Sequence, residues 1–182
     1  RSLKDRNLLG LQVSYIYKLD DDLEAHQIVS IVERNTKKMT VESSQYSRLV
    51  GNTVYFYRDD TSSEQRVTFD VTADIIYNGE RAVYSQELFD KVKTGTYEFI
   101  STTNSSYDLV IIRDYRVMTV GQIDRNNKIL TDERDTGIKI SLDDSEKTVL
   151  VYDANGKEVN FSFISTYDVL TYMDNEKYIE VY

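Results

Sequence analysis

The sequence of 182 residues contains no cysteine and a single histidine, His26. Without thiols the chain forms no disulfide and no thiolate metal site, and it has no cysteine nucleophile. One histidine also excludes a zinc site built on several histidines and a Cys–His catalytic dyad. Nearby carboxylates favour the charged form of His26, which we interpret as a surface residue rather than a catalytic base. We expect no enzyme activity, no cofactor and no metal-assisted hydrolysis of the usual kinds.

Proline is also absent, although average usage of about 5% would give roughly nine. Sharp breaks in the chain must therefore come from Gly, Asn, Asp and Ser, and proline-rich linkers are excluded. The apolar residues are biased towards Val, Ile and 15 tyrosines, while Ala is scarce. These residue types suit strands better than helices. We predict an all-β fold with minor α content, with enough apolar residues for one ordinary core or two small ones.

Two further features limit the possible partners. The chain carries 31 acidic and 22 basic residues, a net charge of −9. Affinity for a phosphate backbone comes from Lys and Arg releasing counterions, so nucleic acid and anionic membrane surfaces are poor partners. The longest aliphatic run, residues 109–112, is far shorter than the about 20 residues of a membrane helix. We therefore expect no membrane insertion.

A short passage of the sequence recurs with its turn residues. The stretch 79–85 aligns without a gap with 156–162, at a constant offset of 156 − 79 = 77 residues, and each copy begins at an Asn-Gly pair. Asn-Gly is the strongest two-residue signal for a β-hairpin, because both central positions of a type I′ turn need positive φ. The long period indicates tandem modules.

The pattern of apolar residues and turns places the modules. A hairpin is expected around the acidic turn at residues 20–22, and Ser85 is a predicted N-cap of a short helix near residues 85–93. We predict two tandem small antiparallel β-sheet or barrel modules, residues 1–84 and 85–182, joined by that helix. Further strands are predicted at residues 36–41, 53–57, 66–71, 74–77, 80–84, 96–101, 107–113, 116–124, 128–132, 138–142, 147–152, 157–163, 167–172 and 177–182, with 46–52 as an irregular connection.

The C-terminal hairpin, residues 167–182, has two interpretations. It either completes the sheet of the second module or opens a third, since a lone hairpin cannot bury its apolar face. We favour the first. Because residue 1 is Arg and no apolar signal segment follows it, we expect the chain to be a fragment or a processed product, with its targeting information elsewhere.

Three passages carry a resemblance to known proteins. They are Gly10–Val13 before an aromatic strand, Ala73–Gly79, and the ending that runs from Tyr167–Leu170 to Tyr178–Tyr182. The pattern resembles the β-rich repeat regions of large surface-layer or stalk-type proteins of Gram-positive bacteria, and modules in virion proteins of the phages that infect them. This resemblance implies a structural or adhesive role in an extracellular assembly, and it carries over no catalytic residue.

Two groups of residues are candidates for binding. The acidic turn Asp20, Asp21 and Asp22 offers oxygens of the kind Ca²⁺ prefers, but it lacks the spaced ligands and central Gly of an EF-hand loop, so we interpret it as a solvated turn. Tyr15 and Tyr17 alternate along one expected strand and Tyr55 and Tyr57 along another, so each pair projects from one face. Such tyrosines either cover the edge of a thin core or form a platform for sugar rings.

We therefore expect a non-enzymatic structural or adhesive module, located on a cell surface or in a virion, whose partners are proteins of the assembly or neighbouring repeats. The alternative function is a carbohydrate-binding module for cell-wall glycan that uses the exposed tyrosines.

Overall fold

The computed structural model describes residues 37–58, 62–101, 105–143, 145, 147–175 and 177–182 in full, and the backbone alone of residues 13–19 and 25–33. Strands make up 58% of the structure and helices 6%, so the predicted β-rich class is confirmed. Strands β1 (Val13–Leu19) and β2 (Ala25–Glu33) form an antiparallel pair. This pair is the hairpin that the sequence predicted at this place, while its acidic turn lies outside the described residues.

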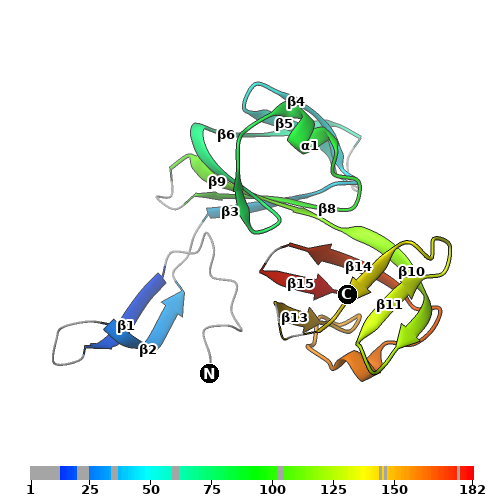
Figure 1. Cartoon of the computed structure of the whole chain (residues 1–182). Helices are drawn as coiled ribbons and strands as arrows, with labels where there is room; N and C mark the ends of the chain where they lie inside the picture. The colour runs from blue at the N-terminus through cyan, green and yellow to red at the C-terminus, as the bar shows by residue number, and fades with distance from the viewer. Residues whose placement is uncertain are drawn as a thin grey trace.

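The largest sheet has seven strands and curls around its own interior (Figure 1). Its order is β3-β8-β9-β6-β5-β4, with β7 paired to β6. The strands are β3 (Lys37–Glu42), β4 (Tyr46–Val50), β5 (Thr53–Tyr57), β6 (Glu64–Tyr77), β7 (Glu80–Ala82), β8 (Gly95–Ser101) and β9 (Tyr107–Asp114). The prediction of an irregular connection at residues 46–52 was wrong, because Leu49 is a buried inward residue of β4.

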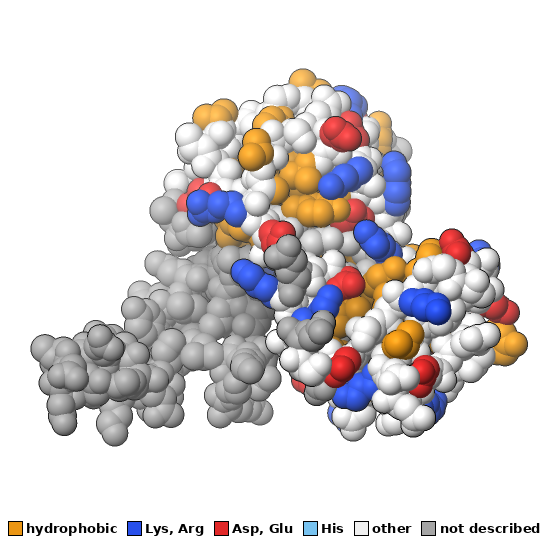
Figure 2. Space-filling model, viewed as in Figure 1, with side chains coloured by type: hydrophobic (Ala, Val, Ile, Leu, Met, Phe, Trp, Pro, Cys, Tyr) orange, Lys and Arg blue, Asp and Glu red, His pale blue; other side chains and the backbone are white. Residues whose placement is uncertain are grey.

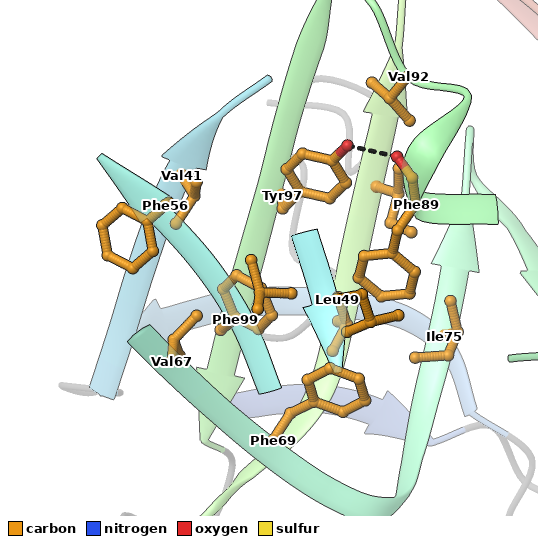
Figure 3. Packing of buried hydrophobic residues seen from close by; sticks show 13 residues of the cluster. Val41, Leu49, Phe56, Val67, Phe69, Ile75, Phe89, Val92, Tyr97 and Phe99 are labelled. Atoms are coloured by element: carbon orange, nitrogen blue, oxygen red, sulfur yellow. Dashed lines mark hydrogen bonds between the residues drawn. The ribbon is translucent and has the colours of Figure 1, made fainter. Parts of the chain in front are cut away.

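Aromatic rings fill the interior of this sheet (Figure 3). The Phe89 ring stacks on Tyr97 with centroids 5.6 Å apart and on Phe69 at 5.9 Å. The Tyr97 hydroxyl, fully buried, donates a 2.6 Å hydrogen bond to the Phe89 carbonyl. We call this set the first cluster; its buried members are Val41, Leu49, Val54, Phe56, Val67, Phe69, Ile75, Phe89, Val92, Tyr97, Phe99, Val110 and Ile112.

Helix α1 (Gln86–Asp90) supplies one of these rings. It begins after Ser85, whose hydroxyl accepts a hydrogen bond from the Leu88 N–H at 3.2 Å, as an N-cap does. Its one buried residue, Phe89, packs inside the first cluster. The predicted cap is thus confirmed, whereas a helix that joins two modules is not. The boundary predicted after Tyr84 falls inside the stretch that forms the first cluster.

The second sheet has six strands in the order β12-β11-β10-β14-β15-β13. They are β10 (Arg116–Asp124), β11 (Ile129–Asp132), β12 (Lys139–Ser141), β13 (Thr148–Val151), β14 (Val169–Asp174) and β15 (Tyr178–Val181). A short 3₁₀ helix covers Phe161–Phe163. The C-terminal hairpin β14–β15 lies within this sheet, which corresponds to the first of its two interpretations.

A separate buried cluster, the second cluster, belongs to this sheet. Its members are Met118, Val120, Leu130, Ile140, Leu142, Val151, Ile164, Leu170, Tyr172, Ile179 and Val181. Every member follows residue 115, while every member of the first cluster precedes it. The described chain therefore buries two large hydrophobic interiors in succession along the sequence, and a third, smaller cluster is formed by Ile100, Leu109 and Ile111 of β8 and β9.

The two Asn-Gly corners differ in detail. Asn78 and Gly79 both have positive φ, 47° and 82°, between the paired residues Tyr77 and Glu80. This is the predicted two-residue hairpin. At the second corner only Gly156 has positive φ, and the chain reaches the 3₁₀ helix after an isolated bridge from Tyr152 to Glu158. A regular strand over residues 157–163 was therefore a wrong prediction.

Candidate functional site: the junction between the two sheets

The connection between the two sheets is a single residue, Tyr115, which lies between the end of β9 and the start of β10. Its backbone N–H donates a 2.7 Å hydrogen bond to the carbonyl of Thr94. Its ring meets the edge of Tyr182, with centroids 5.6 Å apart, and Tyr182 in turn stacks on Tyr152 at 5.0 Å. A connector this short and tied at both backbone and ring restricts the rotation of one sheet against the other.

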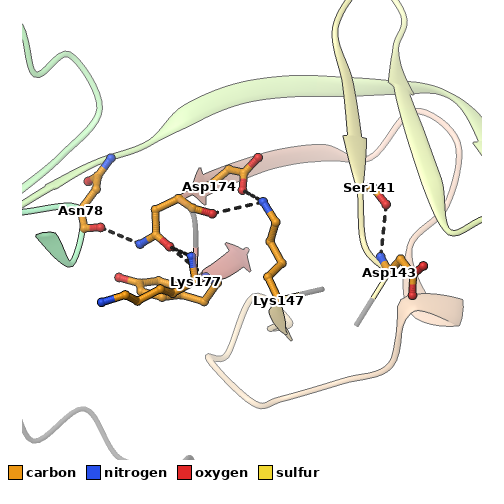
Figure 4. A network of polar contacts seen from close by, with 8 residues as sticks. Asn78, Ser141, Asp143, Lys147, Asp174 and Lys177 are labelled. Carbon is orange, nitrogen blue, oxygen red and sulfur yellow. Dashed lines mark hydrogen bonds and ion pairs between the residues drawn. The ribbon is translucent and has the colours of Figure 1, made fainter. Parts of the chain in front are cut away.

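A second contact joins the sheets at the Asn78-Gly79 corner (Figure 4). The side-chain amide of Asn175, in the turn between β14 and β15, donates a 2.7 Å hydrogen bond to the Asn78 carbonyl. Gly79 lies against the same turn, since a Cβ on it would be 2.6 Å from the Tyr178 hydroxyl oxygen. The corner of one sheet therefore docks on the C-terminal hairpin of the other.

Hydrogen bonds within each sheet hold Asn78 and Asn175 in place. Asn78 donates its amide to the Asp114 carbonyl at 3.1 Å and accepts the Asp114 N–H at 2.7 Å. On the opposite side, the Asn175 side-chain oxygen accepts the N–H groups of Lys177 and Tyr178, each at 2.8 Å. Because the Asn175 side chain and the Asn78 corner are each held by hydrogen bonds within their own sheet, little conformational entropy is lost when the Asn175 amide donates to the Asn78 carbonyl.

An ion pair reinforces the turn of the C-terminal hairpin. The Lys147 ammonium lies 2.6 Å from an Asp174 carboxylate oxygen and donates to the Asn175 carbonyl at 3.1 Å (Figure 4). Lys147 precedes β13, so this contact links the start of β13 to the β14–β15 turn beside the junction.

The charges at the junction are partly shielded from water. Burial, followed by hydrogen bonding to the Asp114 carboxylate, raises the pKa of Tyr77. Burial acts to lower the pKa of Arg113, but attraction to Glu98 and, more weakly, to Glu180 of the second sheet raises it above its ordinary value. Arg113 and Glu98 lie 2.9 Å apart. Arg113 thus carries a charge that interacts with both sheets.

The predicted tyrosine platform is only partly within the described residues. The side chains of Tyr15 and Tyr17, like the turn Asp20, Asp21 and Asp22, lie outside them. Tyr55 and Tyr57 occupy the outer face of β5, opposite the buried Val54 and Phe56. The expectation that Tyr55 and Tyr57 share one face is therefore confirmed.

The ring of Tyr55 is not open on both sides. The Arg48 guanidinium lies 4.2 Å from its centroid and is held there by an ion pair with Glu64, in which one N–H···O distance is 2.8 Å. Tyr57, with 46% of its surface exposed, is the more accessible ring. The face therefore offers one exposed tyrosine ring, that of Tyr57, beside the cation–π pair of Arg48 and Tyr55.

In the part of the chain that the structure describes, no three His, Cys, Asp or Glu side chains converge as a metal site would require. No helix among the described residues is long and apolar enough to cross a bilayer. Nothing in the sequence marks Asn175, Tyr178 or Lys147 as residues of a junction, because no local pattern connects a turn with a corner 97 residues away.

No family model, no curated protein and no solved structure matches this chain.

Proposed function

We propose that this chain is a non-enzymatic structural or adhesive module of a larger extracellular assembly, on a bacterial cell surface or in a virion. The observation that carries the proposal is the fixed junction: a one-residue connector, Tyr115, and a docked corner, Asn78 against Asn175. In such a module the mechanism is geometric. Two β units at a set angle extend reach and present their loops in fixed positions.

Shared topology supports the idea that the two units are diverged copies. In the first sheet β3 pairs antiparallel with β8, β8 antiparallel with β9, and β9 parallel with β6. In the second sheet β10, β14, β15 and β13 repeat these pairings in the same order and directions. The parallel pair is the informative element, because parallel neighbours require a crossover connection, and both crossovers contain an Asn-Gly corner and a short helical turn.

The surface charge supports protein partners or neighbouring repeats rather than nucleic acid. The face shown in Figure 2 carries basic and acidic side chains interspersed, without a continuous basic stripe. The net charge of −9 keeps such a module soluble at high local density and disfavours contact with phosphate backbones.

Fixed geometry is tested by the distance between the units in solution. The chain has no natural cysteine, so spin labels attach only at cysteines that are introduced. We choose Glu87→Cys and Lys157→Cys, which are exposed positions in different units. Double electron–electron resonance should give one narrow distance distribution. A pair within the first unit, Glu87→Cys with Arg66→Cys, supplies the width of a rigid body. A distribution between the units much broader than this control would contradict the proposal.

The extracellular location needs its own experiment. An antibody raised against the folded chain should label intact producing cells, or intact virions, without lysis. Labelling that appears only after the cells or particles are broken would place the chain inside and end this part of the proposal.

The alternative, a cell-wall glycan-binding module, is favoured by one observation: Tyr57 is an exposed ring beside Tyr55 and Arg48 on one sheet face. Pull-down on purified cell wall with Tyr57→Ala tests it, with Tyr84→Ala as a tyrosine control on another strand connection. Glycan binding through this face requires that only Tyr57→Ala reduces retention. Retention that Tyr57→Ala leaves intact excludes the face.

A further inference from the structure

A cleft of about 280 Å³ opens beside the docked corner. Both units contribute to it. The first provides the end of β6, the corner and the end of β9, and the second provides the start of β10 and the end of β14. Its lining residues are Tyr77, Asn78, Glu80, Asp114, Arg116, Tyr172, Met173, Asp174 and Asn175.

The cleft has fixed polar walls. Tyr172 and Met173 also line it, but they are only 4% and 2% exposed, so they offer a ligand very little side-chain surface. The Tyr77 hydroxyl donates to an Asp114 carboxylate oxygen at 2.6 Å, and Asn78 is bound to the Asp114 main chain. These wall groups therefore hold one orientation whether or not a ligand is present, which lowers the entropy cost of binding.

Two charged groups at the cleft remain available for a ligand. Glu80 and Arg116 are both exposed, and neither forms an ion pair with a residue of the described ranges. The charge of Arg116 acts on the Tyr77 phenol, where it opposes the increase in pKa caused by burial and by Asp114. The Glu80 carboxylate, an acceptor from the first unit, and the Arg116 guanidinium, a donor from the second unit, thus lie at the same cleft.

We propose that this cleft binds a neutral sugar residue of monosaccharide size. A pyranose ring carries several hydroxyl groups that both donate and accept hydrogen bonds. A carboxylate such as Glu80 accepts hydrogen bonds from these hydroxyl groups, and the planar guanidinium of Arg116 donates hydrogen bonds to them. A few fixed polar groups of this kind orient a ligand in its site.

The charges of the lining argue against other ligand classes. Because Asp174 is paired with Lys147, the carboxylates of Glu80 and Asp114 remain against the single Arg116, so an anionic ligand meets net repulsion. A bare metal ion is not favoured either, because no three acidic side chains of the described part converge on one point. A neutral ligand that exchanges hydrogen bonds with both signs of charge fits best.

The experiment uses the full chain and four neutral probes: glucose, galactose, mannose and N-acetylglucosamine. Saturation-transfer difference NMR and amide chemical-shift titration should give dissociation constants in the range of about 1–10 mM for at least one probe, as expected for one small ring with few hydrogen bonds. The shifted amides should include those of Glu80 and Arg116. The anionic sugar glucuronate, tested alongside, should bind more weakly than the best neutral sugar.

The matched variants are Arg116→Ala and Glu80→Gln against Arg81→Ala. Arg81 neighbours Glu80 in sequence but pairs with Asp74 and does not line the cleft. We expect each cleft variant to weaken binding about tenfold, the loss of one charge-assisted hydrogen bond, and Arg81→Ala to bind as the unaltered chain does. All three positions are exposed at least in part, and unchanged amide dispersion verifies their fold.

Three results would overturn the proposal: no shift with any neutral sugar at 50 mM (about five times the weakest constant expected), equal binding by the cleft variants and Arg81→Ala, or tighter binding of glucuronate. None of them bears on the fixed angle between the units, which the spin-label distances test separately.

Discussion

Asn175 donates its side-chain amide to the main-chain carbonyl of Asn78 at 2.7 Å, across 97 residues of sequence. The carbonyl belongs to the tip of a two-residue hairpin, where no strand partner remains for it. A part-buried carbonyl without a partner costs free energy comparable to a lost hydrogen bond. The contact therefore satisfies the tip of one sheet with a side chain of the other, and separating the sheets would expose both groups.

The corner itself provides the first prediction. We expect Gly79→Ala to lower the free energy of unfolding by about 2–4 kcal/mol, because left-handed backbone costs Ala about 1–2 kcal/mol and the new methyl group displaces Tyr178. Gly156→Ala is the matched control: Gly156 also has positive φ, 73°, but nothing lies within 4 Å of its added Cβ. Gly156→Ala should lower the free energy of unfolding by about 1–2 kcal/mol. Urea denaturation measures both, and equal losses would show that the corner does not dock.

The second prediction separates the junction from the turn that supports it. Asn175→Asp keeps an oxygen for the Lys177 and Tyr178 N–H groups but replaces the donor with an oxygen that faces the Asn78 carbonyl. We expect Asn175→Asp to lower the free energy of unfolding by about 1–3 kcal/mol at neutral pH. We also expect a broader spin-label distance distribution between the units. Below about pH 4 the protonated carboxyl can donate again, so part of the loss should be recovered. Narrow distances at neutral pH would contradict the role of this amide.

Local chemistry explains what could be predicted from the sequence. Asn78-Gly79 predicts its own turn because positive φ is required at both positions, and Ser85 predicts its helix because its hydroxyl can accept the Leu88 N–H. The alternation of Val54 and Phe56 with Tyr55 and Tyr57 similarly sets which face of β5 is buried. These features depend on neighbours a few residues away, which any reader of the sequence can see.

Long-range pairing explains what could not be predicted. The parallel pairing of β6 with β9 places Ile75 beside Val110, and nothing in either strand indicates its partner. The same holds for the junction, where the Asn175 amide and the Asn78 carbonyl that accepts its hydrogen bond are 97 residues apart. Phe89 gave an ambiguous signal, because an apolar residue on a short helix fits a connector as well as a core. Only the curled sheet, which places Phe69 and Tyr97 on either side of the Phe89 ring, decides whether that ring is buried.

The third prediction concerns that helix. Because Phe89 is fully buried between Phe69 and Tyr97, Phe89→Ala should lower the free energy of unfolding by about 3–5 kcal/mol. Tyr97→Phe, which removes only the hydroxyl that donates to the Phe89 carbonyl, should cost about 1–2 kcal/mol. Thermal unfolding monitored by near-ultraviolet circular dichroism measures both. A loss below 1 kcal/mol for Phe89→Ala (well under the core range) would show that the helix is a surface connector.

The fourth prediction compares two cations that share one carboxylate. Arg113 and Lys38 lie 2.9 Å and 3.0 Å from the same Glu98 oxygen, but the Arg113 side chain is 17% exposed and that of Lys38 42%. Arg113→Met should cost about 2 kcal/mol, since it leaves a largely buried carboxylate with one solvated partner. Lys38→Met should cost less than about 1 kcal/mol. Equal losses, or a loss for Arg113→Met that vanishes in 1 M salt (a Debye length of about 3 Å), would show that burial does not strengthen the pair.

The fifth prediction rests on a β-bulge between β10 and β11. There the backbone of Glu133 approaches Gly121 so closely that a Cβ would lie 2.6 Å from the Glu133 Cα. Asp132 closes the bulge with its carboxylate, which accepts the N–H groups of Arg134 at 2.8 Å, Asp135 at 2.9 Å and Thr119 at 3.0 Å. The Asp135 N–H and then those of Thr119 and Arg134 outweigh burial and lower the pKa of Asp132.

The sign of the pH effect follows from that direction. Because the pKa of Asp132 is lower in the folded chain than the unfolded value of about 3.9, its contribution is fully present above that value and is lost as the pH falls through the folded pKa. Asp132→Asn cannot titrate and keeps only one acceptor oxygen. The difference in free energy of unfolding between the unaltered chain and Asp132→Asn should therefore be constant from about pH 7 to pH 5 and shrink below about pH 4. Urea denaturation along this pH series measures it. A difference that persists unchanged at the acid end would mean that the shape of the side chain, and not its charge, holds the bulge.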